Sequence, residues 1–134
     1  MITGLIITHC RLGHELLKAA EGIVGKQEHV IAVSNDELSL EGLREAVVQV
    51  LRGQDVSDGL LIFVDMFGGS PWRIARELIS KGDAVSGRIG LLTGVHLAML
   101  LSFFQKRRTY AFEKLASVLQ NDGKRGIQLD MGNV

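Results

Sequence analysis

Short apolar runs alternate with longer stretches of helical periodicity along this chain. Residues 2–8, 29–33, 60–64 and 88–92 are rich in Ile, Val and Leu, and polar or glycine residues bound each run. Apolar runs of this length are typical of strands that are buried on both faces of a parallel sheet. We therefore predict four strands, with the strongest signal at 60–64.

Between these runs, apolar residues recur three and four positions apart, which is the spacing of an amphipathic helix. This spacing predicts helices at 12–24, 40–50, 71–80, 97–104 and 109–119. Local signals fit these limits: Gly25 suits a helix end, Ser39 and Ser70 suit N-caps, and Pro71 suits the first helical position. A last short strand is predicted at 126–129.

The order of these elements indicates an α/β fold. Strands that alternate with helices of ten to fifteen residues imply right-handed crossovers and a parallel sheet with helices on both faces. The chain shows no linker, repeat or low-complexity segment, so we expect one domain over residues 1–134. A four-stranded sheet leaves an exposed edge that natural proteins cover, and the segment 126–129 has no obvious partner in its own chain. We therefore expect a homodimer.

Composition narrows the function further. The 134 residues are 46% hydrophobic and 22% charged, and 15 basic residues balance 15 acidic ones. This balance disfavours a nucleic-acid-binding protein, an anionic-membrane binder and a disordered chain. One cysteine favours a reducing compartment, no apolar run is long enough to span a bilayer, and the first residues lack the features of a signal peptide. We therefore expect a cytoplasmic protein.

Two polar residues stand where parallel-sheet proteins commonly bind ligands. His9 directly follows the first predicted strand and Asp65 the third. Ligands bind beyond the carboxyl ends of such strands, where the strand order reverses, and in sheets of this size that point commonly lies between strands one and three. We therefore expect His9 and Asp65 to meet. A carboxylate bonded to one imidazole nitrogen leaves the other nitrogen free as a nucleophile.

The segment Gly68-Gly69-Ser70-Pro71 predicts an anion site beside this pair. Two glycines let a ligand approach the backbone, and the following helix start presents free N–H groups and a positive dipole end. Taken singly, a histidine, an aspartate or such a helix start is more often an ordinary loop or turn feature. Their coincidence suggests a phosphoryl group carried on His9.

We expect no cofactor and no metal. The chain has no G-x-G-x-x-G motif after its first strand and no Walker sequence, which disfavours a dinucleotide cofactor and ATP as a donor. His9, Cys10 and His14 lie close together in the sequence, but a metal needs three or four convergent ligands and no second cluster is present. The run Lys106-Arg107-Arg108 is interpreted as a cationic helix C-terminus.

At these residues the chain resembles the mannose-family enzyme IIA domain of the bacterial phosphoenolpyruvate-dependent sugar phosphotransferase system. The resemblance extends in register over roughly residues 1–105, and its specific part is the strand-end aspartate followed by Phe-Gly-Gly-Ser-Pro. The matching stretches are Ile6-Ile7-Thr8-His9, residues 16–27 (LLKAAEGIVGKQ), residues 63–71 (FVDMFGGSP) and Thr93-Gly94-Val95.

This resemblance implies a phosphohistidine carrier. His9 would accept a phosphoryl group from the phosphocarrier HPr, or a relative of it, and pass it to a IIB domain on a separate chain for sugar uptake. Asp65 would be the carboxylate beside His9, and Ser70 would place a hydroxyl near the phosphoryl group. The anion site predicted above at Gly68, Gly69 and Ser70 would then bind that group. Contact with a membrane would be only indirect, through the transporter. The family fold is a mostly parallel sheet with an antiparallel edge strand exchanged in a dimer, which would be residues 124–130.

The chain departs from the family pattern near the expected site. Cys10 stands where the family usually has Gly, and the family's Gly-Val-Asn-Leu-Pro-Met reads Gly-Val-His-Leu-Ala-Met here, which introduces His96 and Ala98. Two other functions use the same histidine chemistry: a regulatory protein without a transport role, and the phosphotransfer subunit of a dihydroxyacetone kinase. The stretch from Phe67 to Pro71 favours the sugar type over the kinase subunit. A IIA domain need not touch the sugar, so no sugar is predicted.

Overall fold

The computed structural model describes residues 1–81 and 87–133, which form an alternating series of strands and helices. In chain order, the elements are β1 (Thr3–Thr8), α1 (Leu12–Val24), β2 (Val30–Ser34), α2 (Leu40–Arg52), β3 (Leu60–Val64), α3 (Gly69–Lys81), β4 (Ile89–Leu92), α4 (Leu97–Lys106) and α5 (Phe112–Arg125). All the strands and helices expected up to residue 106 are present, with limits that differ from the prediction by a few residues.

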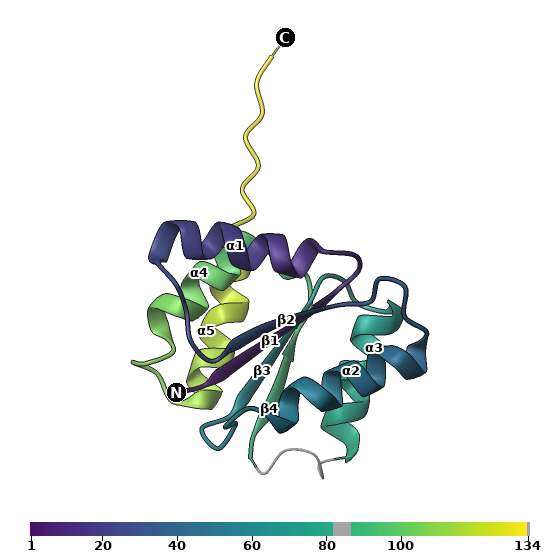
Figure 1. Ribbon diagram of the computed structural model, residues 1–134. Helices are drawn as coiled ribbons and strands as arrows, with labels where there is room; N and C mark the ends of the chain where they lie inside the picture. Colours follow the sequence, from purple (N-terminus) through teal and green to yellow (C-terminus); the bar gives the residue numbers. More distant parts are fainter. Residues whose placement is uncertain (82–86, 134) are drawn as a thin grey trace.

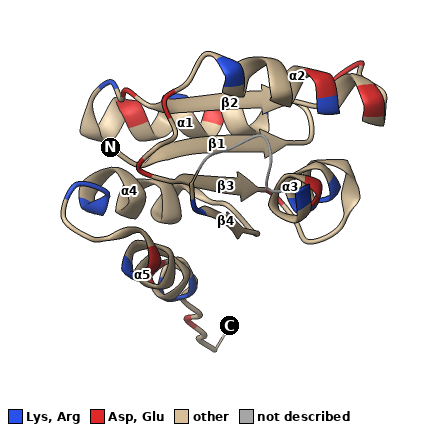
Figure 2. Cartoon of the chain, turned by 90° about the horizontal axis from the view of Figure 1, so that it is seen from below, with Lys and Arg blue, Asp and Glu red and all other residues tan. Residues whose placement is uncertain are grey.

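The strands form one parallel sheet, as predicted, and their order across the sheet is β2-β1-β3-β4 (Figures 1 and 2). The chain first moves from β1 to β2 on one side, and then crosses to β3 on the other side of β1. The strand order therefore reverses between β1 and β3. The residues that follow these two strands meet at the carboxyl edge of the sheet.

Helices cover both faces of the sheet. Helices α1, α4 and α5 lie on one side, and α2 and α3 lie on the other (Figure 1). Alternate residues of the central strands face opposite layers: Ile6 and Phe63 belong to the core under the first group, whereas Leu5 and Ile62 belong to the core under the second. All of these side chains are inaccessible to solvent, which is why β1 and β3 read as continuous apolar runs.

Polar contacts join α2 to α3 on the outer surface. Nε and one terminal nitrogen of Arg44 donate to the two carboxylate oxygens of Glu77 at 2.7 and 2.9 Å. Arg44 also contacts Glu41, one turn earlier on α2. The hydrogen bond from Arg44 lowers the pKa of Glu77, so the pair stays ionised as the pH falls toward the usual range of a glutamate. Figure 2 shows the acidic and basic residues interspersed along α2.

Arg107 corrects the interpretation of the run 106–108 as a merely cationic helix end. Its side chain is only 3% exposed, and its guanidinium donates to three backbone carbonyls and one side-chain amide, those of Ile2, Glu28, His29 and Gln27. It also lies 5.1 Å from the centre of the Phe103 ring. Arg107 therefore fastens the end of α4 to the turn that precedes β2 and to the start of β1.

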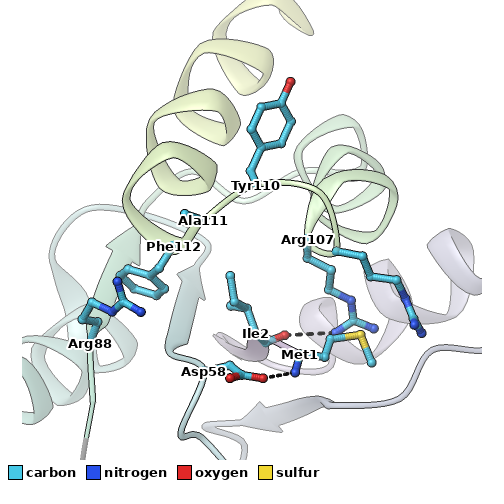
Figure 3. A pocket seen from close by; sticks show the side chains of 9 residues that line it. Met1, Ile2, Asp58, Arg88, Arg107, Tyr110, Ala111 and Phe112 are labelled. Carbon is cyan, nitrogen blue, oxygen red and sulfur yellow. Dashed lines mark hydrogen bonds and ion pairs between the residues drawn. The ribbon is translucent and has the colours of Figure 1, made fainter.

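A cavity of about 450 Å³ opens beside Arg107, at the amino edge of the sheet (Figure 3). Arg88, Arg107 and Tyr110 lie around it, and Ile2 and Phe112 supply apolar lining. Arg88 is already paired with Glu113, at 3.0 Å, and Arg107 is occupied by carbonyl oxygens. This cavity lies at the opposite edge of the sheet from His9 and Asp65.

The end of the chain differs most from the prediction. Helix α5 runs to Arg125, whereas the periodicity predicted an end near Leu119. Contacts with α4 explain the extension, because Asp122 accepts hydrogen bonds from Ser102 and Lys106, and Gly123 packs against Met99. Residues 126–133 form no strand within this single chain, and the end of this segment extends away from the body (Figure 1). Exchange of this segment with a second subunit stays a prediction.

Candidate functional site

His9 and Asp65 meet at the carboxyl edge of the sheet, where the topology brings the ends of β1 and β3 together. Nδ1 of His9 lies 2.9 Å from Oδ2 of Asp65, and the backbone N–H of His9 donates to the same oxygen at 3.0 Å. An ionised carboxylate only accepts hydrogen bonds, so Nδ1 carries the proton in this contact. Nε2 is then the ring nitrogen with a free lone pair.

The surroundings of the two side chains differ. The side chain of Asp65 is 12% exposed, whereas that of His9 is 42% exposed. The second oxygen of Asp65, Oδ1, is buried and has no hydrogen-bond partner among the described residues. The arrangement therefore anchors the imidazole from the protein side through one carboxylate oxygen and leaves its other edge accessible to a second molecule.

Gly69 places the start of α3 directly against this accessible edge. A Cβ at this position would lie 3.2 Å from Cε1 and 3.5 Å from Nε2 of His9, so a side chain here would crowd the free nitrogen. Gly68 and Gly69 also have positive φ angles of 82° and 81°, which glycine adopts without strain. These residues therefore bring backbone N–H groups and the positive end of the α3 dipole close to Nε2.

The prediction of Ser70 as an N-cap required it to precede α3. In the structure, Ser70 instead lies in the first turn of that helix. The helix begins at Gly69, although the positive φ of that residue shows that the regular conformation starts after it. The hydroxyl oxygen of Ser70 lies 3.3 Å from Nδ2 of Asn35, which donates to it. Ser70 directly follows Gly69, the residue at which an added Cβ would lie 3.2 Å from Cε1 of the His9 ring.

Asn35 belongs to the site but was not among the predicted site residues. It directly follows β2, the other neighbour of β1, so its side chain reaches both the His9 loop and the start of α3. In the sequence, Asn35 is only one of the polar residues that follow the predicted strand at 29–33. The rule that placed His9 and Asp65 applies equally to Asn35, because all three follow strands that end at the same edge of the sheet.

Cys10 occupies an exposed turn beside His9 with a φ of 50°, in the left-handed region that favours glycine. Its backbone N–H donates to Oδ1 of Asn35 at 3.0 Å. A hydrogen bond with the Asp36 side chain, followed by the negative charge of that residue, raises the pKa of the Cys10 thiol. A raised pKa disfavours the thiolate form of Cys10 near neutral pH.

His96 and Ala98 pack against α5. Nδ1 of His96 lies 3.0 Å from the carbonyl oxygen of Gly94, and its ring also packs close to Gly123 and Gly126. The Cβ of Ala98 faces Gly126. Both departures from the family pattern thus bear on how the end of α5 packs against the start of α4. Within residues 1–81 and 87–133, no three His, Cys, Asp or Glu side chains converge in a way that would hold a metal.

Three exposed apolar side chains follow His9 and Asp65 within a few residues in the sequence. Leu12 starts α1, and Met66 and Phe67 lie in the loop between β3 and α3; they are 45%, 52% and 74% exposed. The Phe67 ring packs on Trp72 with 4.9 Å between ring centres. A hollow of about 400 Å³ lies next to them, lined by Leu40, Gly69, Ser70, Trp72 and Arg73. None of the helices in the described part of the chain is long and apolar enough to cross a membrane.

Comparison with curated proteins identifies relatives of known type. The chain is 26% identical over 130 residues to the PTS system mannose-specific EIIAB component of Escherichia coli K12, an alignment that covers 92% of this chain and 38% of the relative. It is also 26% identical to the PTS system fructose-specific EIIA component of Bacillus subtilis 168, over 96% of this chain and 86% of the relative. The chain thus spans well under half the length of the Escherichia relative.

Solved structures share the fold. A phosphotransferase system component EIIA from Streptococcus agalactiae superposes with a TM-score of 0.85 at 23% identity, over 96% of both chains. A mannose/sorbose-specific IIA subunit from Enterococcus faecalis gives 0.78 at 19% identity, over 99% of this chain and 98% of that one. The family model described as "PTS system fructose IIA component" matches residues 4–120. Because that match extends over most of the chain, the protein belongs to this family of IIA components of the phosphotransferase system.

Proposed function

We propose that this protein is a phosphohistidine carrier that accepts a phosphoryl group on Nε2 of His9 and passes it on within a sugar phosphotransferase system. The observation that carries this proposal is the 2.9 Å contact between Nδ1 of His9 and Asp65, which leaves Nε2 as the free nucleophile. Nε2 faces the accessible side of the site, next to the first turn of α3. A phosphoryl group on Nε2 would therefore meet the helix N-terminus.

The proposed transfer needs no metal or cofactor. The lone pair of Nε2 attacks the phosphorus of a phosphohistidine on the donor, and the donor P–N bond breaks with its electron pair returning to the donor imidazole. His9 then carries the phosphoryl group on Nε2 while Nδ1 keeps its proton. The ring becomes positively charged, and Asp65 stabilises that charge through the same hydrogen bond.

The phosphoryl oxygens require donors of their own. Backbone N–H groups at Gly68 and Gly69 and the hydroxyl of Ser70 lie at the start of α3 and are the proposed ligands. The onward step is the reverse reaction with a different acceptor, because a nucleophile on that acceptor attacks the same phosphorus and the His9 P–N bond breaks. The protein contributes positioning and charge stabilisation to both steps.

An HPr-like phosphocarrier is the proposed donor of the phosphoryl group, and a IIB unit is the proposed acceptor. We place this transfer in the cytoplasm, where it would serve sugar uptake. The name of the Escherichia coli relative, EIIAB, supports the pairing with a IIB unit. Leu12, Met66 and Phe67 are exposed apolar side chains in the loops that carry His9 and Asp65, and both partners would dock on them in turn. A shared docking face suits a carrier, because donor and acceptor must reach the same nitrogen.

Phosphate mapping tests this function directly. The protein is incubated with phosphoenolpyruvate, enzyme I and HPr, and the labelled residue is identified by mass spectrometry. We expect one acid-labile, base-stable phosphate on His9, and none on the His9→Ala variant. Label on His14, His29 or His96, or an undiminished signal in His9→Ala, would contradict the assignment.

We also propose a homodimer in which the C-terminal segment is exchanged. Ile127, Leu129 and Met131 recur at every second position and are at least 75% exposed, which is the pattern of one face of a strand. Among the described residues, β4 pairs only with β3, so its other edge is open. A cavity of about 280 Å³ lies near β4 and is lined in part by Leu91, Leu92 and Met99.

The dimer makes a prediction with a built-in control. Replacing both Ile127 and Leu129 with Asp is expected to weaken association, because these two side chains would face the neighbouring subunit. Gln128→Asp adds charge on the opposite face of the same strand and is expected to leave the dimer intact. Light scattering at micromolar concentration measures both. A monodisperse monomer of the unaltered protein would contradict the exchange.

A further inference from the structure

We propose that Asn35 is a positioning residue for phosphoryl transfer, which orients the Ser70 hydroxyl so that its hydrogen is free to bind the phosphoryl group on His9. This inference rests on the function proposed above and names a device within the same site. Asn35 joins three loops: its own loop after β2, the turn after β1, and the start of α3. No other side chain among the described residues hydrogen-bonds both the His9 turn and Ser70.

The backbone of Asn35 is fixed on both sides. Its N–H donates to the carbonyl of Thr8 at 3.1 Å, which extends the pairing of β1 and β2 by one residue. Its carbonyl accepts from the N–H of Leu38 at 3.1 Å, which closes the turn that follows. The side chain therefore projects from a fixed point, at the same edge of the sheet as His9.

The hydrogen bonds determine which way the Asn35 amide is turned. The backbone N–H of Cys10 can only donate, and it lies 3.0 Å from Oδ1, so the amide oxygen must face Cys10. The NH₂ group then faces Ser70, with Nδ2 at 3.3 Å from Oγ. Because Nδ2 can only donate, Oγ must accept, and the hydroxyl hydrogen of Ser70 points in another direction.

That hydrogen is the one the proposed chemistry needs. Gly69 lies against the Nε2 edge of His9, and Ser70 is the next residue. A phosphoryl group on Nε2 brings negatively charged oxygens beside the start of α3, where they accept hydrogen bonds. A Ser70 hydroxyl that gave its hydrogen to a neighbouring side chain would be lost to the phosphoryl group. Asn35 prevents this by offering a donor instead of an acceptor.

The second hydrogen bond of Asn35 supports the histidine. Cys10 has a φ of 50°, a conformation that costs energy for any residue with a side chain. Acceptance of its N–H by Asn35 helps to hold this turn, and His9 is the residue before it. The oxygen of the Asn35 amide thus helps to hold the loop that carries His9, and its nitrogen orients the Ser70 hydroxyl.

Asn35→Asp separates the two roles. The carboxylate is nearly isosteric, and one of its oxygens still accepts from Cys10, but the group that faces Ser70 is now an acceptor. Ser70 then donates to this carboxylate, so we expect single-turnover transfer from phosphorylated HPr to slow by roughly tenfold or more near pH 8. At lower pH the new carboxyl becomes protonated and regains a donor, so the rate relative to the unaltered protein is expected to rise.

Four further variants complete the experiment, two of them in a Ser70→Ala background. Asn35→Ala lacks both contacts and is expected to be slow at every pH, without the recovery. Asn121→Asp makes the same chemical change at an exposed position on α5 and is expected to match the unaltered protein. In a Ser70→Ala background, the Asn35→Asp change is expected to lose most of its effect and its pH dependence, because there is no hydroxyl left to orient. Circular dichroism checks that each variant is folded.

The outcomes distinguish this inference from the function beneath it. If His9 of the unaltered protein accepts phosphate but Asn35→Asp transfers at the same rate at every pH, the positioning role is wrong and the carrier function stands. An equally large, pH-dependent effect of Asn35→Asp in the Ser70→Ala background would also overturn it, since the residue would then act without Ser70. If His9 of the unaltered protein takes up no phosphate, the carrier function itself fails.

Discussion

Asp65→Asn is expected to slow phosphoryl transfer to His9 by roughly one to two orders of magnitude. The amide oxygen can still accept from Nδ1 and from the backbone N–H of His9, so the geometry of the ring is kept. The negative charge is lost, however, and the imidazolium that forms with the phosphoryl group is stabilised less. A hydrogen bond to a charged group contributes about 1.5–3 kcal/mol, and each 1.4 kcal/mol is about tenfold in rate.

The position of the second Asp65 oxygen adds a consequence for stability. Oδ1 is buried without a partner among the described residues, so the NH₂ group of an asparagine would sit there without an acceptor. An unsatisfied buried donor costs about 1–3 kcal/mol. Asp65→Asn is therefore expected to fold, but to unfold at a lower temperature than the unaltered protein.

Single-turnover transfer from phosphorylated HPr measures the loss of rate, at a temperature where circular dichroism shows the variant folded. Asp58→Asn is the matched control, because Asp58 is exposed and precedes β3 at the opposite edge of the sheet. That variant is expected to transfer at the unaltered rate. Equal rates in Asp65→Asn and the unaltered protein would show that Asp65 does not act on His9.

The meeting of His9 and Asp65 could be predicted because it follows from the sheet alone. Strands β1 and β3 are buried on both faces, so their apolar runs are continuous and their ends are sharply marked. Once the sheet is parallel and its order reverses between these strands, the residues that follow them must meet. No knowledge of side-chain contacts is needed for that step.

The sheet topology could place Asn35 at the same edge as His9, but not its role, which lies in side-chain hydrogen bonds between distant loops. Its partners, Cys10 and Ser70, are 25 and 35 residues away, and neither the periodicity nor the polarity of the loop indicates them.

Helix α5 was predicted too short for a related reason. Residues 120–125 are mostly polar and contain a glycine, and the contacts of Asp122 and Gly123 with α4, which the sequence does not reveal, favour the helix there.

Arg107 is a further residue whose contacts the sequence does not reveal. It stands between two other basic residues, Lys106 and Arg108, and nothing in the sequence distinguishes it from them. Arg108 is exposed, whereas Arg107 is buried and spans 78 residues to reach the carbonyl of His29. Burial, followed by the positive charge of Arg108, lowers the pKa of the Arg107 guanidinium. The carbonyl oxygens and aromatic rings around the guanidinium stabilise its buried charge.

Arg107→Ala is therefore expected to lower the free energy of unfolding by about 3 kcal/mol, among the larger effects of a single substitution. The change leaves the carbonyls of Ile2 and Glu28 without this donor, removes the contacts with Phe103 and Phe104, and opens a cavity next to them. Arg107→Lys keeps the charge but not the planar fork that serves several carbonyls at once, so an intermediate loss is expected. Arg108→Ala, one residue away, is expected to change stability by less than about 0.5 kcal/mol. Urea unfolding followed by circular dichroism measures the free energy of unfolding of the three variants. Similar small decreases for Arg107→Ala and Arg108→Ala would contradict a structural role of Arg107 beyond that of a cationic helix end.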